Sequence, residues 1–169
     1  MKSVYKILTC AFILISFAFS GMSTANAQNP SNEKQTKETI IKNLIESKNY
    51  VFTAKSVHPQ SSSIRHLTSE YDMKVMGDSI VTYLPYFGRA YSAPVNLSQG
   101  GIQFTSTDFT YTIESKRKEW IIVIKPREPV DVRELTLRVF KNGSASLMVN
   151  STNRQSISYN GVIEARRSK

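Results

Sequence analysis

Residues 67–84 read LTSEYDMKVMGDSIVTYL, and apolar and polar side chains alternate on both sides of Gly77-Asp78. Alternation with a period of two puts the apolar side chains on one face, which predicts two half-buried β-strands. Glycine tolerates the positive φ of a two-residue hairpin turn, so Gly77-Asp78 is expected to join these strands. The register then sets three pairs opposite each other: Val75 with Ile80, Met73 with Thr82, and Tyr71 with Leu84.

A second hairpin is predicted at Asn142-Gly143, between the segments Glu134–Phe140 and Ala145–Asn150. Asparagine followed by glycine is a strong hairpin signal, because both residues adopt left-handed conformations readily. The pairs expected from a two-residue turn are Leu137 with Met148 and Phe140 with Ala145.

Five further β-rich segments raise the expected number of strands to about nine. Trp120–Lys125 is apolar on both faces, as in a central strand that is covered on each side. Short turns favour pairing between neighbouring strands, and a long antiparallel meander curls because curling hides its edges. We therefore predict a mainly β fold, an antiparallel meander that forms a lipocalin-like barrel or half-barrel, with a β-sandwich as the alternative. The five segments are Tyr50–Val57, Ile102–Thr105, Phe109–Glu114, Trp120–Lys125 and Ile157–Ile163.

One helix is predicted at Glu38–Ser47, where four apolar residues recur with helical spacing and form one stripe. So short an amphipathic helix needs a surface to pack on, and we expect it on the β-sheet or across one mouth of the barrel. Residues 28–37 are polar and are predicted to be a flexible leader, which leaves 38–169 as a single β domain. The four apolar residues are Ile40, Ile41, Leu44 and Ile45.

The N-terminus has the three parts of a secretory signal peptide, which we place at residues 1–27. Lys2 and Lys6 form a positive start, an apolar run follows to Phe19, and Ala25-Asn26-Ala27 supplies the small residues that signal peptidase accepts. The apolar run is shorter than the about 20 residues of a membrane span, which favours cleavage over an uncleaved anchor. We therefore expect an exported protein with no transmembrane span after cleavage.

The single cysteine, Cys10, lies near the start of the apolar run. A lipid-acceptor cysteine lies at the end of such a run, so we expect no lipid there. The mature domain then has no cysteine, and disulfides cannot stabilise it even where they are permitted.

The chain carries 22 Lys and Arg against 13 Asp and Glu, a net charge of +9, and removal of Lys2 and Lys6 leaves +7. Export argues against nucleic acid as the partner of this charge and favours an anionic component of the envelope. The alternative is that scattered positive charge only keeps the protein soluble. The basic residues gather at Lys116-Arg117-Lys118, at Lys125 and Arg127, at Arg133 and Arg138, and in the tail at Arg166, Arg167 and Lys169.

No catalytic or metal-binding constellation stands out, so we expect a non-enzymatic protein without a cofactor. Gly77-Asp78-Ser79 is similar to the nucleophile block of one esterase class, but the histidine of that class follows the block, whereas His58 and His66 precede it. Two histidines without further close-spaced ligands do not make a zinc site. The acids Glu70, Asp72 and Asp108 fall on predicted solvent faces or turns, and single out no catalytic pair.

The segment 83–91, YLPYFGRAY, is the candidate for a binding site. Four aromatic residues, a proline, a glycine and an arginine fall together where a strand is expected to end. Such a loop either folds over one end of the core or presents an adhesive surface to a ligand. Gly100-Gly101 marks a bulge or a close backbone approach, here expected beneath this loop. The candidate ligand-binding residues are Tyr83, Tyr86, Phe87, Arg89 and Tyr91.

Five stretches carry a resemblance to a known family: ESKNYVFTA at 46–54, YLPYFGRAY at 83–91, GGIQF at 100–104, NGSASL at 142–147 and NRQSISYNG at 153–161. Together they resemble family number 4251 of the domains of unknown function, whose members are small exported proteins from Bacteroidetes. The resemblance spans nearly the whole mature domain. It implies a location in the periplasm or cell envelope of a Gram-negative bacterium, and brings no activity, cofactor or catalytic residue.

Two functions stay open on the sequence. The first is a β shell that binds an apolar or amphipathic ligand such as a lipid, in its interior or at its end, with Arg89 offering a charge to a head group. The second is an interaction module without a cavity, whose basic surface binds an anionic envelope component or a partner protein. An enzyme that acts on envelope glycan or lipid ranks behind both. A hollow or a packed interior is the observation that separates the first two.

Overall fold

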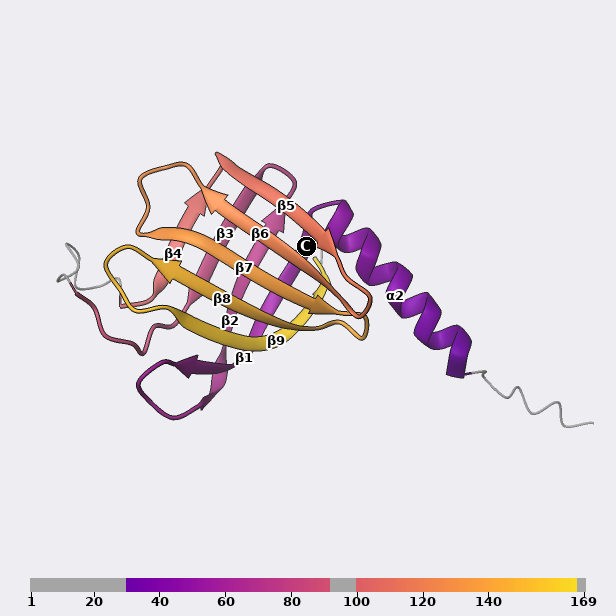
Figure 1. Ribbon diagram of the computed structural model, residues 1–169, viewed down its shortest axis with the longest axis horizontal. Coiled ribbons are helices and arrows are strands. Elements are labelled where there is room, and N and C mark those ends of the chain that lie inside the picture. The colour runs from indigo at the N-terminus through magenta and orange to yellow at the C-terminus, as the bar shows by residue number, and fades with distance from the viewer. Residues whose placement is uncertain (1–29, 92–99, 167–169) are drawn as a thin grey trace, which may run out of the picture.

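The computed structural model describes residues 30–91 and 100–166, which form one helix and nine strands (Figure 1). The mainly β class predicted from the sequence is confirmed. The signal peptide expected at 1–27 lies outside the described residues, and within them no helix is long and apolar enough to cross a membrane. The elements are α2 (Pro30–Glu46), β1 (Asn49–Pro59), β2 (Arg65–Met76), β3 (Ser79–Leu84), β4 (Ile102–Ser106), β5 (Phe109–Ser115), β6 (Glu119–Pro126), β7 (Val132–Phe140), β8 (Ser144–Ser151) and β9 (Ile157–Ala165).

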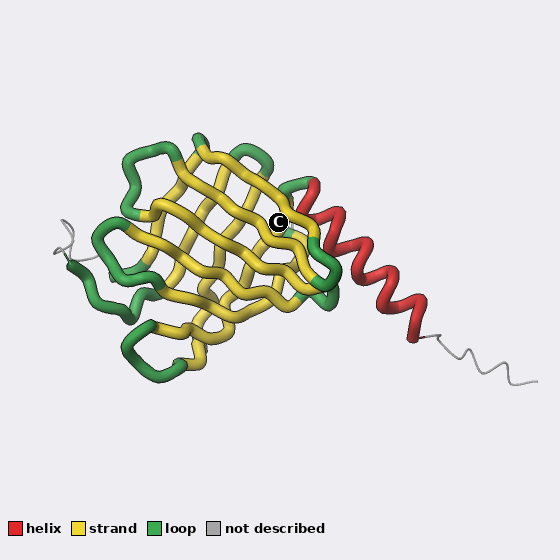
Figure 2. The backbone as a smooth tube through the Cα atoms, viewed as in Figure 1, coloured by secondary structure: helices red, strands yellow, loops and turns green. Residues whose placement is uncertain are grey.

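The nine strands form one antiparallel sheet in the order β4-β3-β2-β1-β9-β8-β7-β6-β5. Consecutive strands pair within β1–β4 and within β5–β9, as a meander requires, and the first strand pairs with the last. The sheet bends so far that the strands of its two halves cross over each other, as Figure 2 shows. The predicted barrel is therefore present, nearly closed, and the alternative sandwich of two sheets is not. The two edge strands, β4 and β5, do not pair with each other, and we call the line between them the seam of the barrel.

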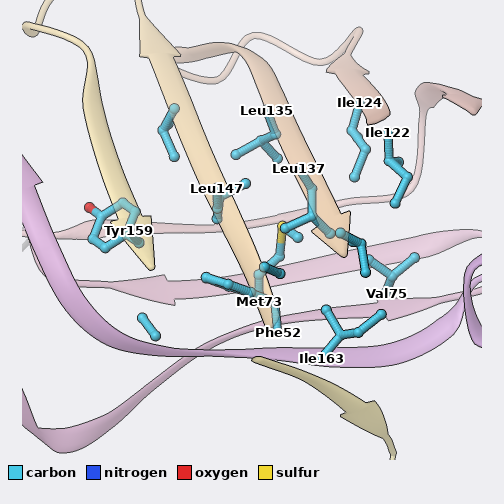
Figure 3. Packing of buried hydrophobic residues seen from close by; sticks show 14 of the residues in the cluster. Phe52, Met73, Val75, Ile122, Ile124, Leu135, Leu137, Leu147, Tyr159 and Ile163 are labelled. Carbon is cyan, nitrogen blue, oxygen red and sulfur yellow. The ribbon is translucent and has the colours of Figure 1, made fainter. Parts of the chain in front are cut away.

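Apolar side chains from both halves of the sheet fill the interior of the barrel (Figure 3). Strand β6 shows how alternation produces this core, because Trp120, Ile122 and Ile124 are buried while the residues between them are half-buried on the outer face. β6 lies next to the edge strand β5, so the central position predicted for it is wrong. Its outer apolar residue Ile121 is sheltered between longer polar side chains in register with it. The core residues labelled in Figure 3 are Phe52, Met73, Val75, Ile122, Ile124, Leu135, Leu137, Leu147, Tyr159 and Ile163.

The first hairpin has the predicted turn, and the second does not. Gly77 has a φ of 65°, and the two pairs nearest the turn, Val75 with Ile80 and Met73 with Thr82, are confirmed.

The turn between β7 and β8 has three residues instead of two, because the Gly143 amide donates to the Phe140 carbonyl at 2.9 Å and Gly143 takes a φ of 86°. The extra residue shifts the register by one, which moves a side chain to the other face of a strand. Leu137 therefore faces Leu147 in the core, and Met148 lies outside, 44% exposed.

Helix α2 begins at Pro30, eight residues before the predicted start, so residues 30–37 of the expected leader are helical. Proline suits the first turn of a helix, and the residues that follow it include no further proline and no glycine, which explains the extension. Ile41 and Ile45 are buried against the barrel, whereas Ile40 of the same predicted stripe is exposed. The helix therefore packs through its C-terminal half and projects from the barrel with the rest (Figure 1).

Two tyrosine hydroxyls fasten the end of the helix to the barrel. Tyr111 of β5 donates to the Ile45 carbonyl at 3.1 Å, and the Tyr50 hydroxyl lies 3.2 Å from that of Tyr111. The helix C-terminus leaves carbonyls without partners of their own, so this bond satisfies one of them. Burial raises the pKa of Tyr111 to about 12 and raises that of Tyr50 well above its usual value.

Candidate functional site

Residues 85–91 follow β3, and we call this segment the aromatic loop. Some of its side chains pack on the barrel, and others are exposed. The Tyr86 ring is half-buried, and its hydroxyl lies 2.8 Å from the Arg89 carbonyl and 3.0 Å from the Gln155 carbonyl, either of which can accept its proton. The buried Tyr159 hydroxyl donates to the Pro85 carbonyl at 2.6 Å. Burial raises the pKa of both tyrosines, so their hydroxyls remain donors at neutral pH.

The turn between β8 and β9 holds the aromatic loop from the other side. The Tyr91 amide donates to the Asn153 carbonyl at 2.8 Å, and the Gln155 amide donates to the Arg89 carbonyl at 3.0 Å. Ala90 and Arg154 form a β-bridge between these two bonds. The backbone of the loop is therefore fixed to the barrel, and its side chains are presented from a supported position.

Three of the predicted aromatic residues are exposed at this end of the barrel: Tyr83 is 49% exposed, Phe87 38% and Tyr91 66%. Tyr83, on the outer face of β3, stacks on Tyr71 with ring centroids 5.6 Å apart.

The predicted cation, Arg89, is also exposed, and a second arginine from β2, Arg65, lies over the Phe87 ring at 4.9 Å. The structure thus places four of the five predicted residues where a ligand can reach them. The fifth, Tyr86, is half-buried, and its hydroxyl helps to hold the loop on the barrel.

Arg154 organises this end of the barrel and was not found from the sequence. Its Nε lies 3.1 Å from Asp131 Oδ2, its Nη1 donates to the Gly101 carbonyl at 2.9 Å, and its guanidinium lies over the Tyr86 ring at 5.3 Å. The side chain is only 15% exposed. Its partners come from segments far apart in the chain, so no local pattern could have indicated it.

A pocket of about 270 Å³ lies beside Arg154, between the start of β4 and the connection from β6 to β7. It is lined by Gly101–Phe104 of β4 and its approach, by Pro129–Val132 and by Arg154. A Cβ on Gly101 would come within 2.5 Å of the Leu84 carbonyl, which confirms the expected close backbone approach just before the aromatic loop. Two of the residues that line the pocket, Ile102 and Val132, belong to the hydrophobic core, so the pocket reaches the edge of the core at this end of the barrel.

Glu128 holds the turn that joins β4 to β5. The amides of Thr107 and Asp108, which join β4 to β5, donate to Glu128 Oε1 at 3.0 and 3.2 Å. Hydrogen bonds to the carboxylate, that of the Ser106 hydroxyl foremost, lower the pKa of Glu128. Glu128 thus ties the turn between the two edge strands to the connection from β6 to β7.

Replacing Arg154 with methionine is expected to lower the free energy of unfolding by about 2 kcal/mol, because Asp131 is left partly buried without its cation. The control is Lys42→Met, which breaks an ion pair with Glu46 at 3.7 Å whose two side chains are both more than half exposed. That change should matter by less than about 1 kcal/mol. Urea unfolding of both variants measures the difference, and equal losses would contradict the role given to Arg154.

The motifs set aside in the sequence have ordinary positions in the structure. Gly77-Asp78 forms the turn from β2 to β3, and Ser79 pairs with Met76 beside it. His58 Nε2 lies 3.0 Å from Asn160 Nδ2 and 3.3 Å from the Ser56 hydroxyl. In residues 30–91 and 100–166, no three or more His, Cys, Asp or Glu side chains are placed to hold a metal ion.

The comparisons with known proteins identify a family and a matching fold. The model of DUF4251, a domain of unknown function, matches residues 32–163. A crystal structure of a DUF4251 family protein from Bacteroides eggerthii superposes with a TM-score of 0.54 and 12% sequence identity, and the match covers 77% of this chain and 88% of that one. No curated protein matches the chain significantly.

Proposed function

This chain belongs to the DUF4251 family, and we propose that it is a non-enzymatic protein of the periplasm or cell envelope that binds an amphipathic, anionic ligand at the aromatic end of its barrel. In this proposal the signal peptide is removed after Ala27. Tyr83, Phe87 and Tyr91 contact the apolar part of the ligand, and Arg89 meets its head group.

The packed interior supports an external site. The largest buried side chains, such as Tyr50, Phe52 and Tyr159, occupy the space that a lipocalin-like protein would offer to a ligand. A lipid chain could enter only by displacing them, and native cores contain few voids larger than a water molecule. The ligand of this proposal therefore lies against the end of the barrel and not inside it.

The observation that carries the proposal is the exposure of aromatic rings beside arginines on a supported loop. Aromatic rings bind apolar groups over a large area at small entropic cost, and tyrosine also suits a boundary between apolar and wet surroundings. Among the described residues, neither Arg65 nor Arg89 forms an ion pair with an acid, so both can attract an anion. An amphiphile with a negative head group matches both features.

A calorimetric titration with lysophosphatidylglycerol, below its micelle concentration, tests the proposal. We expect the double variant Phe87→Ala, Tyr91→Ala to bind at least about tenfold more weakly, since each truncation removes a large contact. The control is Phe140→Ala, Met148→Ala, which removes two exposed apolar side chains from β7 and β8. Lysophosphatidylcholine, with no net charge, should bind more weakly than the anionic lipid. Absence of binding, or equal binding by both double variants, would refute the site.

The second candidate, an interaction module that uses its basic surface, has narrower support. Many of the basic side chains are paired with acids, for example Arg138 with Glu119 at 2.9 Å. Arg117 and Lys118 are exposed together on the turn from β5 to β6 and, in the described structure, have no acidic partner. Binding that disappears at high salt and on Arg117→Ser, Lys118→Ser, but survives Phe87→Ala, would favour this candidate.

A further inference from the structure

The outer edge of β5 is not paired with another strand in the described structure. β5 pairs with β6 alone, and it stands at the outer rim of the front layer (Figure 1). Its seven residues contain no proline, no glycine and one charge, Glu114. Natural edge strands are usually shortened, bent or charged because they otherwise pair with another chain.

The bonds at both ends of the ladder show which backbone groups are free. The Lys116 amide donates to the Glu119 carbonyl, and the Arg127 amide donates to the Asp108 carbonyl, each at 2.8 Å. Bonding alternates along an antiparallel strand, so the even-numbered residues of β5 face β6. The amides and carbonyls of the odd-numbered residues face outward, and in the described part of the chain no hydrogen bond reaches them. These residues are Phe109, Tyr111, Ile113 and Ser115.

We propose that two copies of this chain associate through β5, edge to edge and antiparallel, with Thr112 opposite itself on a two-fold axis. An isologous contact of this kind uses the same surface on both partners, so it closes at a dimer. The partner is a second copy, and the association does not involve the residues of the proposed ligand site.

The register follows from hydrogen bonding and charge. Outward-facing groups must meet outward-facing groups, so odd-numbered residues pair with odd-numbered ones. The register centred on Thr112 is the one that overlaps all seven residues of both strands. It sets Glu114 against Thr110 of the other copy, and Lys116 against Asp108, so opposite charges meet at both ends. A shift that centres the pairing on Tyr111 would instead place Glu114 against Asp108, which is repulsive.

This pairing also covers an exposed apolar side chain. Ile113, 38% exposed in one copy, comes opposite Tyr111 of the other, on the same face of the continuous sheet. Isoleucine and tyrosine are favourable cross-strand partners.

Sedimentation equilibrium of the mature protein over about two decades of concentration tests the dimer. The wild type should pass from monomer to dimer. Lys116→Asp and Asp108→Lys should each weaken dimerisation at least about tenfold, through two like-charge contacts per dimer, and the two changes combined should restore it. Lys42→Asp, which removes an exposed ion pair on α2, is the control and should leave the dimer unchanged.

A second variant tests the backbone pairing directly. Ile113→Pro removes an amide that faces the free edge and leaves the ladder to β6 its donors, so the fold should survive, as circular dichroism would show. Ile113→Val, which keeps the amide, is the matched control. A wild type that stays monomeric throughout, or charge variants that dimerise as tightly as the wild type, would overturn the proposal.

Discussion

Replacing Gly161 with alanine is expected to lower the free energy of unfolding by about 3 kcal/mol, a large effect for one added methyl group. Gly161 lies in β9 at the point where β1 bulges between Ala54 and Ser56. A Cβ on Gly161 would come within 2.9 Å of the Thr53 carbonyl carbon and 3.1 Å of Ala54 Cα, and it would lie closer still to the Thr53 carbonyl oxygen. These are backbone atoms of the pairing that closes the barrel, so they cannot turn aside as a side chain could.

Gly100→Ala is the matched control for this prediction. A Cβ at Gly100 meets nothing within 4 Å, so the change should be neutral or slightly stabilising. The midpoint of urea unfolding, with an unchanged slope, measures both variants. If Gly161→Ala unfolds at the same urea concentration as Gly100→Ala, the close approach of the β1 backbone to Gly161 is wrong.

Above pH 10 the free energy of unfolding is expected to fall by up to about 4 kcal/mol per pH unit. Burial raises the pKa of Tyr50, Tyr111 and Tyr159 above the ordinary value of 10.0. The unfolded chain therefore releases these three protons before the folded chain does. The stability they provide is complete below pH 10 and is lost as the pH rises toward the folded-state pKa values, at about 1.4 kcal/mol per pH unit for each tyrosine.

Urea unfolding from pH 8 to 11.5 measures this slope. Tyr159→Phe should reduce it by about a third, and it should also lower stability at neutral pH by about 1 kcal/mol, because the bond to the Pro85 carbonyl is lost. A free energy of unfolding that stays level from pH 9 to 11.5 would contradict the burial of these hydroxyls.

The strands and the first hairpin followed from local patterns. Alternation with a period of two requires only that one face of each strand contacts solvent and the other contacts the core. Gly77 adopts the positive φ that its hairpin turn requires. The turn at Asn142-Gly143 shows where local reasoning stops. The same dipeptide serves turns of two and of three residues, and the packing of Leu137 against Leu147 decides between them. The length of α2 was missed because residues 31–37 include no apolar residue, so its first turns carry no hydrophobic stripe.

The candidate ligand site stays a prediction, and the structure shows where its residues lie. Aromatic density drew attention to residues 83–91, and four of the five chosen residues are exposed. Nothing in the sequence distinguishes Tyr86 from the other aromatic residues of this segment, yet its hydroxyl lies within hydrogen-bond distance of the Arg89 and Gln155 carbonyls. Arg154 looked like an ordinary turn residue. Its guanidinium acquires a role only because Asp131, Gly101 and Tyr86 converge on it.

The order of apolar and polar residues was enough to specify antiparallel strands, short turns and one helix, since each of these depends on neighbours within about ten positions. The closure of β1 on β9, the seam between β4 and β5, and the filling of the interior depend on contacts between residues about a hundred positions apart. Such contacts are set by how side-chain volumes and backbone bulges fit once the sheet has bent. For that reason folding, and not the linear pattern, determined that the interior of the barrel is filled with side chains, which leaves the end of the barrel for the proposed site.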